Sequence, residues 1–260
     1  MRSEQQQVVF LAWQDPASRA WFPIGRLSCE GGEHYRFVYT RGFLRAREAA
    51  GLAPLIGFPE VEQIYESSEL FPLFKNRIMS RQREDYSSYL ERMALPEAPS
   101  PLSLLARSAG RRTTDSFEIF PYPLVRGEQG DLRFRVDFFV HGIRHMPKEA
   151  AARAGELAPG ARLYLVSDWQ NPEDPQAVAV RTEDKVLLGY VPRYYGEDLE
   201  RLRQVRAPAR VEVLQVNLPP APVQQRLLVR LDAPWAARTA PLSSDVYQPL
   251  ADAPPAALAG

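Results

Sequence analysis

The chain has 260 residues, with 32 Lys and Arg against 32 Asp and Glu, so its formal net charge is zero. This balance excludes a general electrostatic attraction to nucleic acid or membrane, and any nucleic-acid site must therefore be local. The single cysteine, Cys29, excludes an internal disulfide framework and fits a reducing cytoplasm. No apolar run reaches the about 20 residues of a membrane span, so we expect a cytoplasmic protein.

Residues 8–125 are expected to form a mixed module of strands and helices. Alternating apolar residues predict an initial group of strands at 8–13, 21–28 and 34–40. Helical spacing of apolar residues then predicts helices at 85–95 and 101–110. An extended run at 115–123 ends the module.

Short strands dominate the chain after a polar, glycine-containing linker at 124–132. They are expected at 134–140, 161–168, 177–180, 186–191, 211–217 and 226–231. Two short helices, at 148–157 and 196–205, interrupt them. This pattern predicts a small curved sheet or barrel over 133–232, and an α+β fold class for the whole chain. Residues 233–260 are rich in Ala and Pro and are expected to form a mobile tail.

Catalytic and metal-binding patterns are not found in the sequence. There is no Walker-type phosphate loop, and one cysteine cannot form a zinc pair. His141 and His145 are four residues apart, but no further Cys or His lies nearby. Carboxylate pairs such as Glu173 and Asp174 lie in turns, where solvated acids are ordinary. We therefore expect a protein that is not an enzyme and needs no cofactor or metal.

The stretch DWQNPEDPQAVAV, residues 168–180, places a stiff polar turn before a small, β-branched strand. Pro172 and Pro175 each fix a backbone angle, and Asn171 and Asp174 can bond their own backbone. Polar loops at strand ends often carry binding groups. A stiff hairpin connection without further function is the alternative interpretation.

Aromatic and basic residues gather at other strand ends. Arg144 follows Gly142, Tyr190 follows Gly189, and Arg193 lies in the next turn. Single-stranded nucleic acid is bound by rings that stack on bases and by cations that contact phosphates. These residues offer both properties, while packed tyrosines and solvated arginines would explain the same spacing.

The order FFVHGIRHM, then ELAPGARLYLVSDWQNPEDPQAVAV, then VLLGYVPR resembles the HIRAN domain over residues 134–232. This resemblance implies a compact β-barrel of OB-like character that captures the 3′ end of single-stranded DNA. By motif position, Arg144 would grip the end of the strand. Tyr190 and Arg193 would line the pocket, and Asp174 would meet the terminal sugar. The candidate DNA-binding set is completed by His145, Asn171 and Trp169.

Two positions depart from the HIRAN pattern. DNA-binding members have two aromatics after the arginine, where this chain has His145 and Met146. His145 can still stack on a base, whereas Met146 is a poorer platform. Glu173 occupies a position that can be aromatic, and its charge would repel phosphate.

Residues 20–95 show a second resemblance, to the N-terminal lobe of HipA-type toxin kinases, in the stretches IGRL, FVY and PLIGFP. The kinase core is missing, so the resemblance implies an interaction module without phosphotransfer. Residues 75–112 hold eight Lys or Arg against four Asp or Glu. Solvated arginines are the alternative to a set of auxiliary phosphate contacts at Lys75, Arg77, Arg81, Arg111 and Arg112.

Two functions remain open from the sequence. The first is an accessory protein of DNA repair or defence whose barrel captures single-stranded DNA at a 3′ end. The second is a protein-interaction adaptor without catalytic activity in a toxin–antitoxin or restriction-type system. Single-stranded DNA is the expected partner in the first case, and a protein bound through the N-terminal module in the second. No membrane partner is expected.

Overall fold

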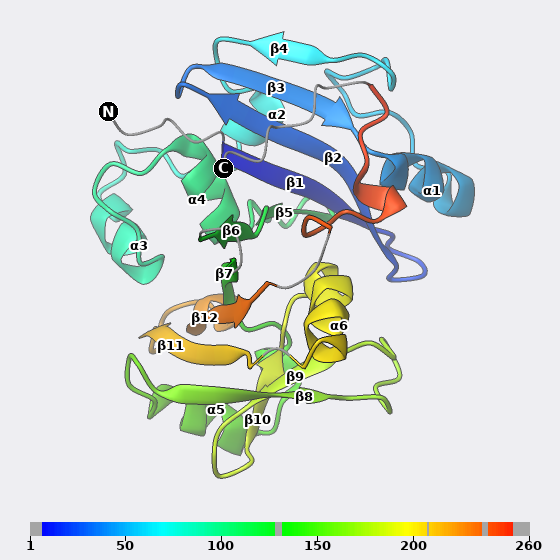
Figure 1. The fold of residues 1–260 in the computed structure, drawn as a ribbon. Coiled ribbons are helices and arrows are strands. Elements are labelled where there is room, and N and C mark those ends of the chain that lie inside the picture. Colours follow the sequence, from blue (N-terminus) through cyan, green and yellow to red (C-terminus); the bar gives the residue numbers. More distant parts are fainter. Residues whose placement is uncertain (1–6, 128–131, 207, 236–238, 252–260) are drawn as a thin grey trace. The chain divides into compact units, whose positions relative to one another are not determined.

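The computed structural model describes residues 7–127, 132–206, 208–235 and 239–251. The chain divides into two compact units, which we describe separately (Figure 1). Unit 1 comprises Met1–Tyr86, Glu97–Tyr122 and Leu242–Gly260, and unit 2 comprises Ser87–Pro96 and Pro123–Pro241. Both units are built on antiparallel sheets with few helices, which confirms the expected α+β class.

Unit 1 contains a five-stranded antiparallel sheet in the order β4-β3-β2-β1-β5. Its strands are β1 (Gln7–Gln14), β2 (Trp21–Glu30), β3 (His34–Tyr39), β4 (Tyr65–Ser67) and β5 (Phe117–Pro121). The helices of unit 1 are α1 (Arg41–Ala50), α2 (Pro72–Lys75) and α4 (Pro101–Ser108), whereas α3 (Tyr86–Arg92) belongs to unit 2 except for its first residue. The alternating pattern of the third strand is confirmed, because Phe37 and Tyr39 are fully buried in an aromatic core with Phe43, Phe58 and Phe74.

The end of the chain differs from the mobile tail that its composition predicts. Leu250 N donates to Tyr39 O at 2.9 Å, and Arg41 N donates to Gln248 O at 2.8 Å. Tyr247 is 7% exposed, and its ring packs edge-to-face on the ring of Phe10 with the two centroids 5.4 Å apart. Residues 242–251 are therefore part of unit 1. The few large apolar side chains of this segment bury enough surface to hold it in place, although its Ala/Pro-rich composition predicts a mobile tail. Residues 236–238 and 252–260 of the expected tail lie outside the described residues.

Unit 2 contains a seven-stranded antiparallel sheet in the order β10-β9-β8-β11-β12-β7-β6. Its strands are β6 (Leu124–Arg126), β7 (Arg133–Phe139), β8 (Arg162–Ser167), β9 (Val178–Arg181), β10 (Leu187–Tyr190), β11 (Arg210–Val216) and β12 (Leu227–Pro234). Helix α5 (Lys148–Gly155) and helix α6 (Gly196–Gln204) lie where the sequence predicts them. A bridge between His141, just beyond β7, and Tyr190 of β10 closes the sheet into a barrel. The predicted small barrel is thus confirmed.

The boundary between the units differs from the expected one in two ways. β6 comes from the expected linker, yet it pairs with β7 in the barrel. The segment Ser87–Pro96, expected in the N-terminal module, belongs to unit 2. There Gln215 Nε2 donates to Glu91 O at 2.6 Å, and Asn217 Nδ2 donates to Arg92 O at 2.8 Å. These amides lie more than a hundred residues away in sequence, so local periodicity cannot indicate the docking.

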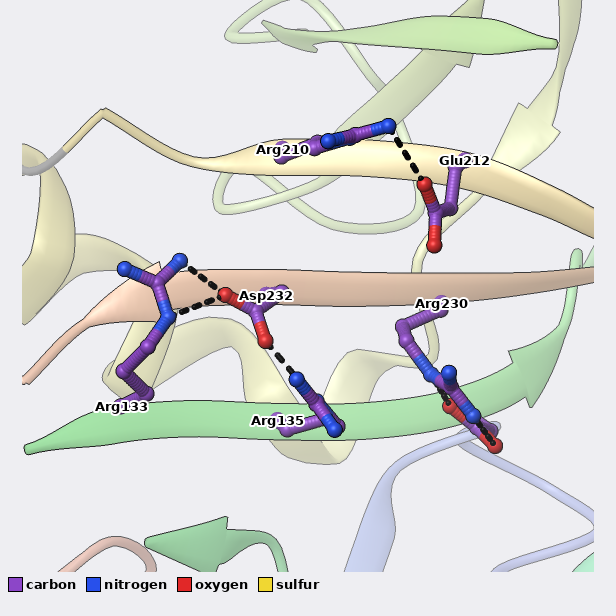
Figure 2. A network of polar contacts seen from close by, with 7 residues as sticks. Arg133, Arg135, Arg210, Glu212, Arg230 and Asp232 are labelled. Atoms are coloured by element: carbon purple, nitrogen blue, oxygen red, sulfur yellow. Dashed lines mark hydrogen bonds and ion pairs between the residues drawn. The ribbon is translucent and has the colours of Figure 1, made fainter. Parts of the chain in front are cut away.

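The outer face of β7, β12 and β11 carries alternating charges that oppose each other across the strands (Figure 2). Arg133 and Arg135 both donate to Asp232, and Arg230 Nε donates to Asp137 Oδ1 at 2.8 Å. Such cross-strand pairs favour one register, because a slip of one residue would place like charges or apolar groups opposite each other. The ion pairs therefore stabilise the observed register of β7, β12 and β11 in the wall of the barrel.

Candidate nucleic-acid interface

Three segments of unit 2 meet where the barrel closes: the end of β7, the β8–β9 loop and the end of β10. His141 N donates to Tyr190 O at 2.9 Å, and Tyr190 N donates back to His141 O at 2.8 Å. Gly142 has a φ of 74°, and a Cβ there would lie 3.2 Å from the Tyr190 ring. The ring of Tyr190 is therefore held against the backbone of the turn that leads to Arg144.

The β8–β9 loop is stiffened by hydrogen bonds to its own backbone, as its sequence predicts. Asn171 Oδ1 accepts from Glu173 N at 3.0 Å and from Asp174 N at 3.2 Å. Asp174 Oδ1 accepts from Gln176 N at 3.0 Å. These bonds satisfy polar backbone groups inside a tight turn, so the loop has a fixed shape before any ligand arrives.

Asp168 connects this loop to the aromatic residue of β10. Its Oδ2 accepts from Tyr190 Oη at 2.9 Å and from Asn171 Nδ2 at 3.2 Å. Burial, and then the hydrogen bond to Asp168, raise the pKa of Tyr190 above its ordinary value, so its hydroxyl stays a donor. Asp168 is absent from the site that the sequence predicts. Its position at the end of β8, four residues after Tyr164 on the same face, could have indicated it.

Arg193 and Asp174 form an ion pair at the same end of the barrel. Arg193 Nε donates to Asp174 Oδ2 at 2.8 Å, and Nη2 donates to Glu173 O at 2.6 Å. The sequence places both residues in the site, and the structure brings them together. Each carboxylate oxygen has more than one lone pair, so Asp174 keeps acceptor capacity towards solvent.

Arg144 and His145 lie on an exposed 3-10 turn, Ile143–His145, directly after Gly142. Arg144 Nε donates to His145 Nε2 at 2.9 Å. The turn lies next to β10, the strand that carries Tyr190, and both side chains are exposed there. A cation and a flat ring are therefore exposed on a turn next to β10.

Trp169 does not join the other candidate residues. Its side chain is 74% exposed and lines a hollow of about 460 Å³ between the β8–β9 hairpin and α6. Pro175, Leu199 and Leu202 line the same hollow. The alternation of side chains along the strand explains this, because Asp168 and Trp169 are neighbours and point to opposite faces.

The auxiliary basic residues are mostly engaged within unit 1. The Arg77 side chain is 2% exposed, and its Nη2 lies 2.6 Å from Asp115 Oδ2. Arg77 is thus a buried structural residue and not a phosphate contact, which corrects the expectation. Arg111 pairs with the buried Glu118 at 2.6 Å.

The other members of the auxiliary set are more accessible. Lys75 pairs with Glu69 on the surface at 3.2 Å, and Arg81 Nη2 donates to Pro99 O at 3.4 Å. Arg112 is exposed. In the part of the chain that the structure describes, no group of three or more His, Cys, Asp or Glu could hold a metal ion, and no helix is long and apolar enough to cross a membrane.

The closed barrel, with polar and aromatic side chains from three strand ends, defines unit 2 as a small β-barrel domain. Residues 134–232 match the family model of the HIRAN domain. This part of the chain is a HIRAN domain, which points to nucleic-acid binding.

Two solved structures are similar to the chain. A protein from Lactobacillus plantarum is 24% identical, with 40% of this chain and 97% of that chain covered and a TM-score of 0.33. The HIRAN domain of human HLTF is 16% identical, with 39% and 72% covered and a TM-score of 0.28. No curated protein matches the chain. The comparisons do not support the expected resemblance of residues 20–95 to HipA-type kinases.

Proposed function

We propose that unit 2 captures single-stranded DNA at a free 3′ end, and that the chain is an accessory protein of DNA repair or bacterial defence. In this role the chain binds without catalysis and acts in the cytoplasm. The observation that carries the proposal is the ordered end of the barrel. There the Tyr190 ring is fixed by Asp168 and by the backbone of Gly142, which begins the turn that carries the exposed Arg144.

A loop that is already ordered before DNA binds is suited to a site that captures the end of a strand. A single nucleotide at a free end offers few contacts, and ordering a loose loop on binding would subtract from that small binding free energy. Here the loop hydrogen bonds of Asn171 and the ion pair of Arg193 with Asp174 exist without ligand. In the proposed complex, a base stacks on Tyr190, Arg144 contacts a phosphate, and Asp174 accepts from the terminal sugar hydroxyl.

The test measures binding of labelled single strands to the full chain, with a free or a phosphate-blocked 3′ end. Tyr190→Ala is expected to weaken binding by about 1–3 kcal/mol through lost stacking. Tyr190→Phe keeps the ring and should bind nearly as the parent. Arg144→Ala should weaken binding and also reduce its salt dependence, because one phosphate contact is lost.

Asp174→Asn distinguishes end capture from general strand binding. It keeps the size of the side chain but removes the charge that orients Arg193. We expect it to reduce the preference for a free 3′ end while binding of internal segments stays nearly unchanged. Arg210→Ala is the matched control, since Arg210 pairs with Glu212 on β11, away from the site. If the parent binds no single strand at low salt, the proposal fails and a protein-binding adaptor, acting through the N-terminal module, takes its place.

A further inference from the structure

A second group of aromatic and basic side chains lies on the outer face of the β8–β9 hairpin. The guanidinium carbons of Arg162 and Arg181 lie 5.3 Å and 4.9 Å from the centroid of the Tyr164 ring. Tyr164 and Arg181 face each other directly in the register of the two strands. A cation within about 6 Å of a ring is attracted to its π-face, which holds the three side chains together.

The two arginines differ from the arginines of the barrel wall in Figure 2. There, Arg133, Arg135, Arg210 and Arg230 each lie against a carboxylate. Within the described ranges, neither Arg162 nor Arg181 makes an ion pair with a carboxylate. Arg181 Nη1 donates to the backbone, to Thr182 O at 2.8 Å. Glu212 lies opposite Arg162 in the register of β11 and β8, but it is paired with Arg210 at 2.9 Å. The cluster therefore presents two positive charges that are not paired with a carboxylate of the described residues.

The acidic residues nearest in sequence do not cancel this charge. Glu183 and Asp184 lie in the β9–β10 turn that follows Arg181. Asp184 is already paired with Arg153 of α5, at 3.1 Å, and Glu183 is exposed to solvent. A negatively charged ligand would therefore meet the Arg162–Tyr164–Arg181 cluster without displacing an internal ion pair.

The strand register connects the cluster to the strand-end site. Tyr190 lies opposite Ala179, and Ala179 lies opposite Val166 of β8, so all three side chains share one face. Tyr164 is two residues before Val166 on that face, which is about 7 Å along the strand. Between the two tyrosines lie Ala179, which is 1% exposed, and Val166, which is 38% exposed. The side chains between the two tyrosines are therefore small and apolar, and none of them is charged.

We infer that a DNA strand whose 3′ end occupies the Tyr190 site continues along this face to the Arg162–Tyr164–Arg181 cluster. The inference rests on the proposed function. An upstream base stacks on Tyr164, and the guanidinium that it displaces from the ring contacts the neighbouring phosphate. Rings and cations in alternation are what single strands require, and arginine serves in both roles. The cluster thus adds affinity that depends on strand length.

The experiment compares a trinucleotide with a decanucleotide, both with free 3′ ends and a label at the 5′ end, on the full chain. The parent should bind the decanucleotide about tenfold more tightly, since an extra base and its phosphates are engaged. Tyr164→Ala should remove most of this gain and leave the trinucleotide affinity unchanged. The double variant Arg162→Ala with Arg181→Ala should also reduce the salt dependence of decanucleotide binding.

Two control variants separate folding from binding. Tyr164→Phe retains the ring and should keep the parent affinity for both strands. Arg45→Ala removes one exposed positive charge from α1 of unit 1 and should change neither affinity. Unchanged trinucleotide binding by Tyr164→Ala shows that the strand-end site is still folded.

The possible failures are distinguishable. If the parent binds neither strand, the proposed function fails and the inference fails with it. If the parent binds both strands equally well, or if Tyr164→Ala leaves decanucleotide binding untouched, the cluster has no part in binding and only this inference is overturned.

Discussion

Replacement of Gly189 by alanine is expected to open the barrel at the point where the candidate site is built. Gly189 has a φ of 147°, a conformation that residues with a side chain rarely adopt. A Cβ at this position would lie 2.3 Å from the carbonyl oxygen of His141 and 2.7 Å from Val140 Cγ1. The first of these atoms belongs to the backbone, so it cannot move aside without shifting the strand.

The expected loss of stability has two sources: the strained φ of the new alanine and the hydrogen bonds that break when the clash moves the strands apart. The unfavourable φ alone costs about 1–3 kcal/mol. Moving the strands apart also breaks the two hydrogen bonds between His141 and Tyr190, at about 0.5–1.5 kcal/mol each. The sum is a loss of roughly 2–6 kcal/mol in the free energy of unfolding of unit 2. Single-strand binding should fall as well, because the Tyr190 ring loses its fixed position.

Hydrogen exchange followed by mass spectrometry measures this directly. Peptides that contain His141 and Tyr190 should exchange faster in Gly189→Ala, while peptides from β1 and β2 in unit 1 should be unaffected. Gly196→Ala is the matched control, because Gly196 begins α6 with a φ of −56°, and a Cβ added there would meet no described atom of another element within 4 Å. We expect it to stabilise the chain by about 0.4–1 kcal/mol. Unchanged exchange and stability in Gly189→Ala would refute the reasoning.

Three further outcomes are expected. Tyr247→Ala should lower the unfolding free energy of unit 1 by about 2–4 kcal/mol in urea, since a buried ring is removed, and a loss below measurement error would mean that the end of the chain does not pack. Arg77→Leu should destabilise unit 1 by roughly 2–4 kcal/mol by leaving the Asp115 carboxylate without its positive partner, yet DNA binding to the folded protein should not change. Burial raises the pKa of Asp232, but hydrogen bonds from Arg133 and Arg135 outweigh it and hold that pKa below its ordinary value. The stabilisation from the Asp232 carboxylate is complete above its ordinary pKa and is lost as the pH falls through its pKa in the folded protein. In urea titrations, Asp232→Asn should therefore lose less stability in acid than the parent does. An identical dependence of stability on pH would contradict this role of Asp232.

Local sequence patterns predicted most of the elements because their causes are local. The alternation of residues 34–40 places Phe37 and Tyr39 in a core, and Asn171 and Asp174 stiffen a turn through neighbours two or three residues away. The same reasoning could not place Arg77, whose carboxylate partner lies 38 residues further along the chain. In a basic stretch, a solvated arginine and a buried one look alike until the partner is known.

The candidate site shows the same division between local and distant causes. The strand-end residues were found because glycine, proline and aromatic residues recur at expected strand ends. Asp168 was not, because its role depends on Tyr190, 22 residues away and brought near by the β9–β10 hairpin. The pairing of Arg193 with Asp174 spans 19 residues for the same reason. Sequence therefore predicts which groups lie at the strand ends, and the register of three strands determines which of them lie close together.

Barrel closure and ligand binding depend on the same few atoms in unit 2. The hydrogen bonds of His141 with Tyr190 join the end of β7 to β10, and they also fix the backbone that carries the Tyr190 ring. A ligand that stacks on this ring binds the closed barrel and not an opened one, so it must stabilise closure by mass action. Single-stranded DNA should therefore slow hydrogen exchange at His141 and Tyr190 in the parent. The same coupling explains why a glycine is required at position 189: the close approach of two backbones is what places the ring against Gly142, at the start of the turn that carries Arg144.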